Sequence, residues 1–92
     1  MKIEWSETAL ANRKSIFRFI SSDNPRAAIA LDERFRNLAA KLKAFPHLGR
    51  PGRVEGTREF VAHKNYILIY ELDGGIVRIL RVLHAARLWP PD

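Results

Sequence analysis

The sequence predicts an α+β fold, in which a helical hairpin packs on a mainly antiparallel sheet in the order β-α-α-β-β-β. Two observations predict it. Apolar residues recur at helical spacing through residues 9–45 and at the shorter period of strands after residue 56. A loop rich in glycine and proline, residues 47–56, separates these two regions. With 92 residues, we expect one domain that spans residues 1–92.

The first half of the chain reads as a short strand followed by two helices. Residues 2–5 form the strand, and Ser6 can cap a helix that continues to about residue 21. Asn24 can cap the second helix, with Pro25 at its first position. The apolar stripe of the second helix is Ala28, Leu31, Phe35, Leu38, Leu42 and Phe45. The short break between the helices predicts an antiparallel hairpin.

Three strands follow the loop. Residues 57–62 form one strand, and residues 66–72 form a second that is apolar on both faces and is therefore expected at the centre of the sheet. A turn at residues 73–75 leads into a third strand over residues 76–83, and residues 84–92 form a tail. One face of the sheet takes the hairpin. We expect the other face, partly covered by the tail, to carry the function.

Composition limits the function classes. The net charge of +6 and a pI of about 10.3 favour an anionic partner, which is nucleic acid or an acidic protein segment. The chain has no cysteine, which excludes disulfides and thiolate metal sites. It opens without an apolar run of signal-peptide length and lacks any run that could span a bilayer, so we expect a cytoplasmic protein with no membrane partner.

Basic residues gather in the loop and around the last strand. They are Arg50, Arg53, Arg58, Arg78, Arg81 and Arg87, with His84 beside them. Strict alternation along the last strand places Arg81 with Val77, Ile79 and Leu83, and places Arg78 with Leu80, Val82 and His84. The two strand arginines, Arg78 and Arg81, are therefore expected on opposite faces.

These residue types suit phosphate chemistry. A guanidinium binds two oxygens at once, and a histidine can take or give a proton near neutral pH. Together they could cleave RNA by attack of the ribose 2′-hydroxyl without a metal. The alternatives are structural: strand-edge arginines are commonly solvated or salt-bridged, and a histidine at a strand end is commonly hydrogen-bonded. Histidines with metal-ligand spacing and nucleotide-binding fingerprints are both absent from the sequence, so no metal and no cofactor is expected.

The remaining aromatic residues and histidines carry less specific expectations. Trp89 could stack on a base, pack into a partner or fold back on the sheet. His47 and His63 are expected to be inert loop residues, and Tyr66 and Tyr70 to be core residues.

The pattern as a whole resembles the RelE/ParE toxin superfamily. Besides the order of elements, the resemblance rests on GTREFV at 56–61 followed by NYILIY at 65–70, and on the ending ILRVLHAARLWP at 79–90. WSETA at 5–9 and NPRAA at 24–28 are also similar to members of this group. The resemblance covers nearly the whole chain.

The resemblance implies a toxin that inhibits growth and is neutralised by an acidic antitoxin encoded beside it. The antitoxin wraps the helical hairpin and sheet, and it links the pair to operator DNA. ParE-like members poison DNA gyrase, whereas RelE-like members cleave mRNA on the ribosome. In the ribonuclease branch, the matching residues would be Arg58, Arg81, His84 and Arg87; Arg50, Arg53 and Trp89 would bind the target or nucleic acid.

The ending favours the ParE-like branch. The ribonuclease branch usually has an aromatic residue, often tyrosine, soon after the last strand and more lysine in the middle loop. This chain has AARL at 85–88 before Trp89, and the basic residues of its loop are arginines. Whether the protein is an enzyme depends on this choice. A basic RNA- or protein-binding module without toxicity is the further alternative.

Overall fold

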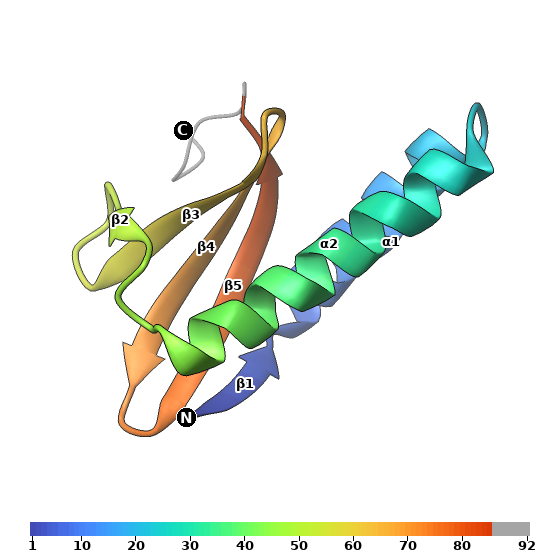
Figure 1. Cartoon of the computed structure of the whole chain (residues 1–92). Coiled ribbons are helices and arrows are strands. Elements are labelled where there is room, and N and C mark those ends of the chain that lie inside the picture. The colour runs from blue at the N-terminus through green and yellow to red at the C-terminus, as the bar shows by residue number, and fades with distance from the viewer. Residues whose placement is uncertain (86–92) are drawn as a thin grey trace.

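The structure, a computed structural model, describes residues 1–85. Its elements are β1 (Lys2–Trp5), α1 (Glu7–Ser21), α2 (Pro25–Ala44), β2 (Arg50–Pro51), β3 (Thr57–His63), β4 (Tyr66–Asp73) and β5 (Ile76–His84). The predicted order is confirmed with one addition, since the two-residue strand β2 lies in the segment expected to be a loop (Figure 1).

Both helices begin at the predicted caps. The hydroxyl oxygen of Ser6 accepts a hydrogen bond of 3.0 Å from the nitrogen of Ala9, and the side-chain oxygen of Asn24 accepts one of 3.1 Å from the nitrogen of Ala27. Ser6 also donates to the carbonyl of Leu80, which ties the start of α1 to β5. Within residues 1–85, neither helix combines the length and apolar content that crossing a membrane would need.

The sheet has five strands in the order β1-β5-β4-β3-β2. β1 runs parallel to β5, and the other neighbours are antiparallel. β4 is central as predicted, and three successive residues of this strand, Leu68, Ile69 and Tyr70, are buried. Two helices on a mostly antiparallel sheet confirm the predicted fold class.

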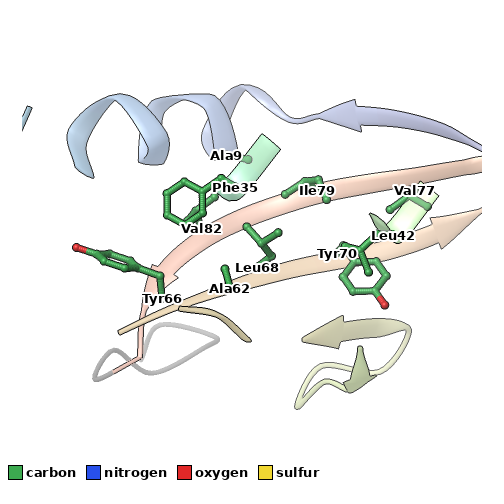
Figure 2. Packing of buried hydrophobic residues seen from close by; sticks show 10 residues of the cluster. All are labelled: Ala9, Phe35, Leu42, Ala62, Tyr66, Leu68, Tyr70, Val77, Ile79 and Val82. Atoms are coloured by element: carbon green, nitrogen blue, oxygen red, sulfur yellow. The ribbon is translucent and has the colours of Figure 1, made fainter. Parts of the chain in front are cut away.

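The main core lies between the helical hairpin and one face of the sheet. Ala9 of α1 and the α2 residues Phe35 and Leu42 meet Leu68 and Tyr70 of β4 (Figure 2). Ala62 of β3 and Val77, Ile79 and Val82 of β5 also belong to this layer. Tyr66 and Tyr70 both belong to the core, as the sequence predicted.

A β-bulge in β5 changes which residues share a face. Ile69 pairs with Arg81 while the next residue, Tyr70, pairs with Ile79, so Leu80 is an extra residue. Arg78 pairs with Glu71, two positions from Ile69 on β4, and so Arg78 and Arg81 lie on the same face. The prediction that these arginines point to opposite faces was therefore wrong, because strict alternation does not survive a bulge.

Candidate functional site

The face of the sheet that points away from the helices is here called the outer face. Cross-strand pairing places Arg50, Glu59, Ile69 and Arg81 in one row across β2, β3, β4 and β5. A neighbouring row contains Thr57, Glu71, Arg78 and Glu4. The outer face therefore carries the predicted site residues Arg50 and Arg81, and Arg78 lies beside them.

Glu59 holds the arginines at the β2 edge of the outer face. Its carboxylate accepts a hydrogen bond of 3.1 Å from the guanidinium of Arg50 and one of 3.3 Å from the backbone nitrogen of Arg53. The Glu59 side chain is only 9% exposed, whereas that of Arg50 is 63% exposed. A buried carboxylate thus holds the arginine-bearing loop while the Arg50 guanidinium keeps donors directed to solvent.

Arg78 lies in the neighbouring row of the outer face, beside β1. Its guanidinium donates to Glu4 on β1 at 3.0 Å, to Glu71 at 3.1 Å and to Asp73 at 2.9 Å. The hydrogen bonds to Glu4, Asp73 and Glu71 raise the pKa of Arg78 above its ordinary value. Three carboxylates around one cation make this part of the outer face acidic, and the ion pairs join β1 to the β4–β5 hairpin.

Arg58, a predicted catalytic residue, contacts the backbone of the segment that follows α2. It is paired with Tyr70 and so lies on the helix side of the sheet. Its guanidinium donates a hydrogen bond of 3.0 Å to the carbonyl of Gly49 and one of 3.3 Å to the carbonyl of His47. The fork of Arg58 therefore holds the segment that follows α2.

His84 lies at the other end of the helix side. It pairs with Tyr66, and the two rings meet edge to face with centroids 5.3 Å apart. The β4 partners of Arg58 and His84, Tyr70 and Tyr66, are four positions apart, which corresponds to roughly 13 Å along the strand.

The predicted catalytic residues are therefore not gathered at one point. Arg58 and His84 lie at opposite ends of the helix side, and Arg81 lies on the outer face. Arg87 and Trp89 fall outside the described residues. Within residues 1–85, the side chains of His, Asp and Glu form no group of three that could hold a metal.

A groove of about 450 Å³ on the helical hairpin was missed by the sequence analysis. Its lining consists of Leu10, Arg13, Lys14, Phe17, Arg18 and Asp32. Leu10 and Phe17 belong to the apolar residues whose helical spacing predicts α1, yet their side chains are 43% and 37% exposed. Ala9, Ile16 and Ile20 occupy the core side of α1 instead. The sequence did contain a signal for this groove, because Leu10 and Phe17 are seven residues apart and so form a second apolar stripe on α1.

Arg13 forms the rigid part of this groove. It makes two hydrogen bonds of 2.9 Å to the carboxylate of Asp32 on α2, and its guanidinium carbon lies 4.5 Å from the ring centroid of Trp5. Lys14 and Arg18 beside it are exposed. The groove therefore combines two exposed apolar side chains with cations.

A second groove of about 670 Å³ runs between α1 and the end of β5. Its lining consists of Asn12, Ser15, Ile16, Phe19, Tyr66, Val82, Leu83 and His84. Asn12 accepts a hydrogen bond of 3.0 Å from the backbone nitrogen of Val82, beyond the point where β1 pairs with β5. His84 thus borders a cavity, although without the predicted arginines.

The family model that describes the ParE toxin of the type II toxin-antitoxin system parDE matches residues 3–89. This chain belongs to the ParE toxin family. The putative toxin Y4kP of Sinorhizobium fredii is 38% identical over 90 residues, covering 97% of this chain and 93% of that protein. The toxin RelE2 of Caulobacter vibrioides is 33% identical over 87 residues, covering 95% and 98%. The family assignment confirms the predicted resemblance to RelE/ParE toxins.

Solved structures of this superfamily share the fold. A chain of the chromosomal ParDE toxin–antitoxin system from P. aeruginosa superposes with a TM-score of 0.80 at 22% identity, covering 91% of this chain and 95% of that one. YafQ from E. coli superposes with a TM-score of 0.67 at 20% identity, covering 96% and 97%. The hairpin-on-sheet architecture of this ParE-family toxin is thus that of its superfamily.

Proposed function

We propose that this type II toxin inhibits growth by binding and poisoning DNA gyrase, without a catalytic step of its own. The observation that carries the proposal is the separation of Arg58, Arg81 and His84 over two faces and two ends of the sheet. The match to the ParE family model supports the same target class.

Metal-free RNA cleavage sets a strict geometric requirement. A base within hydrogen-bond reach of the 2′-hydroxyl, about 3 Å, and a cation beside the same phosphate must act on one nucleotide. Arg58 instead donates to two backbone carbonyls, and Arg81 lies across the sheet from His84. The described residues offer a basic binding surface in place of an assembled general acid and base.

We propose that the cognate antitoxin occupies the groove on the helical hairpin. The exposed Leu10 and Phe17 side chains next to Lys14 and Arg18 suit an acidic amphipathic segment, because its apolar side and its carboxylates each find a partner. Operator DNA would be bound through the antitoxin. Arg50 and Arg53 remain proposed contacts to the target, and Trp89 and Arg87 remain proposals that lie outside the described residues.

The proposal is tested with purified toxin, gyrase and plasmid DNA. The expected result is loss of supercoiling and accumulation of cleaved DNA, with growth arrest and a DNA damage response in cells. His84→Gln should leave these effects unchanged, whereas removal of a general acid or base would cost roughly 100-fold or more.

The ribonuclease alternative has one observation in its favour, the position of His84 beside the second groove. Primer extension on cellular mRNA separates the two targets. Discrete new 5′ ends that disappear with His84→Gln would replace gyrase by mRNA as the target. If cells that express the protein stay healthy, both toxin functions are excluded, and a binding module without toxicity is the remaining alternative.

A further inference from the structure

The segment that joins α2 to β3, here called the clamped loop (residues 45–56), exposes apolar side chains at an otherwise basic end of the molecule. Phe45 is 61% exposed and Leu48 is 46% exposed, and the nitrogen of Leu48 donates to the carbonyl of Phe45 in one turn. Residues 41–56 contain the cations Lys41, Lys43, Arg50 and Arg53, and Glu55 is their only acid. The loop thus displays two apolar anchors among cations.

Buried side chains hold the first part of the loop in place. The hydroxyl of Tyr70, a fully buried residue, accepts from the nitrogen of Gly49 at 2.9 Å and donates to the carbonyl of Pro46 at 2.8 Å. Arg58 donates to the carbonyls of His47 and Gly49. Four hydrogen bonds with Tyr70 and Arg58 therefore fix the backbone at Pro46, His47 and Gly49, on both sides of Leu48.

The second part of the loop is held in the same way. The carboxylate of Glu59 binds the side chain of Arg50 and the backbone of Arg53. The hydroxyl of Thr57 donates a hydrogen bond of 2.6 Å to the carbonyl of Val54, and the nitrogen of Gly52 donates one of 2.8 Å to the carbonyl of Thr57. The loop is short of space as well, since a Cβ on Gly52 would lie 2.3 Å from the Thr57 hydroxyl oxygen.

Such an arrangement suits binding. Exposed apolar side chains on a fixed backbone lose little conformational freedom when they are buried by a partner, so more of the contact energy becomes affinity. Phenylalanine and arginine are enriched in protein interfaces, where apolar anchors lie inside a polar rim. A loop that read nucleic acid would need its cations and a stacking ring but would gain little from Leu48. Apolar anchors with surrounding cations therefore favour an acidic protein surface over a phosphate backbone.

We propose that the clamped loop is the surface by which the toxin binds its target protein, at an acidic patch with an apolar depression that receives Phe45 and Leu48. The proposal rests on the proposed function, in which the target is a protein. Arg58, Tyr70 and Glu59 are positioning residues for this surface. The loop is separate from the hairpin groove proposed for the antitoxin, since it shares no lining residue with that groove and follows the opposite end of α2 from the hairpin turn (Figure 1).

The test uses two variants of the full chain, Phe45→Ser with Leu48→Ser, and Arg50→Ser with Arg53→Ser. Growth arrest on induction, gyrase inhibition and binding to the cognate antitoxin are measured for each. The expected result is a loss of toxicity and of target affinity of roughly 10-fold or more in both variants, because anchor residues dominate interfaces. Antitoxin affinity should stay within about 3-fold of wild type, because both substitutions lie outside the hairpin groove.

Ile29→Ser and Arg26→Ser are the matched controls. Ile29 is 51% exposed and Arg26 is exposed, and both lie at the start of α2, far along the helix from the loop. Each control should arrest growth as wild type does. Circular dichroism and retained antitoxin binding establish that the loop variants are folded.

The outcomes separate this proposal from the proposed function. Full toxicity in the apolar variant, or loss of antitoxin binding in either loop variant, overturns the loop proposal. Loss of toxicity in the arginine variant alone also overturns it, because the loop would then bind a phosphate backbone. If wild-type toxin leaves gyrase active but the loop variants still lose growth arrest, the gyrase function fails while the loop remains the target surface.

Discussion

The hydroxyl group of Tyr70 lies 2.9 Å from the backbone nitrogen of Gly49 and 2.8 Å from the carbonyl oxygen of Pro46. One buried side chain of the central strand therefore satisfies a donor and an acceptor of the chain that leaves α2. In the folded protein, the ring of Tyr70 packs in the core, while its hydroxyl forms hydrogen bonds with the loop. The two roles can be separated by substitution.

Tyr70→Phe should lower the free energy of unfolding by about 1–3 kcal/mol, because the ring remains while the buried nitrogen of Gly49 loses its acceptor. Urea denaturation measures the loss. Tyr66→Phe is the control, since the Tyr66 hydroxyl makes no hydrogen bond within residues 1–85 and points away from the neighbouring core residues (Figure 2). Equal losses in the two variants would contradict a specific role for the Tyr70 hydroxyl.

Gly49→Ala should destabilise the same contact by crowding. An added Cβ would lie 2.7 Å from both the ring carbon Cε1 and the hydroxyl oxygen of Tyr70, and 2.9 Å from the carbonyl of Glu59. Overpacking of this kind costs about 1–3 kcal/mol. Gly75→Ala is the matched control, because a Cβ there meets nothing within 4 Å and its φ is not positive. Thermal denaturation of both variants decides, and a Gly49→Ala protein as stable as wild type would show that the loop can move away.

Most of the fold was predictable because its signals are local. Ser6 and Asn24 cap the helices as predicted, and the change of period placed the strands. The bulge at Leu80 was not predictable, since an extra residue in one strand is defined by its partner strand. The strand β2 was missed for a similar reason, because its pairing with β3 depends on Glu59 and the loop contacts rather than on periodicity.

Arg13 should couple energetically to Asp32. The forked pair joins α1 to α2, and both side chains are largely shielded from solvent, at 15% and 30% exposed. In a double-mutant cycle with Arg13→Met and Asp32→Asn, we expect a coupling energy of about 1 kcal/mol. Unfolding in urea gives the four stabilities. A coupling energy of zero would mean that the contact with Trp5, rather than the ion pair, holds Arg13 in place.

Arg78→Met should lower the thermal stability and should do so less in 1 M salt. Removal of the guanidinium leaves Glu4, Glu71 and Asp73 close together without their cation, and salt screens the resulting repulsion. The raised pKa of Arg78 adds no pH dependence between pH 5 and 9, because the group stays protonated in both folded and unfolded chains. Arg26→Met serves as the control, since Arg26 forms no ion pair in the described part of the chain. A melting temperature that falls equally at low and high salt would contradict this origin.

The candidate site was only partly predictable. Arg50, Arg53 and Arg58 were recognised as a group, yet their contacts differ. The guanidinium of Arg50 meets a buried carboxylate and that of Arg58 meets two carbonyls, whereas Arg53 is held through its backbone nitrogen. Sequence shows which residues are basic, but the acceptors come from β3 and from the turn after α2. The exposed Leu10 and Phe17 were hidden by their helical spacing, which fits a core stripe equally well.

Leu10→Ser with Phe17→Ser should weaken the binding of the cognate antitoxin by roughly 10-fold or more, because both apolar anchors of the hairpin groove are removed. Toxicity without antitoxin should stay at the wild-type level, since the groove is not the proposed target surface. Titration calorimetry with purified antitoxin and growth arrest on induction measure the two effects. This double variant mirrors the clamped-loop variants, which should keep antitoxin binding and lose toxicity. If the hairpin substitutions abolish both activities in a folded protein, target and antitoxin compete for one surface, and the proposed division between groove and loop fails.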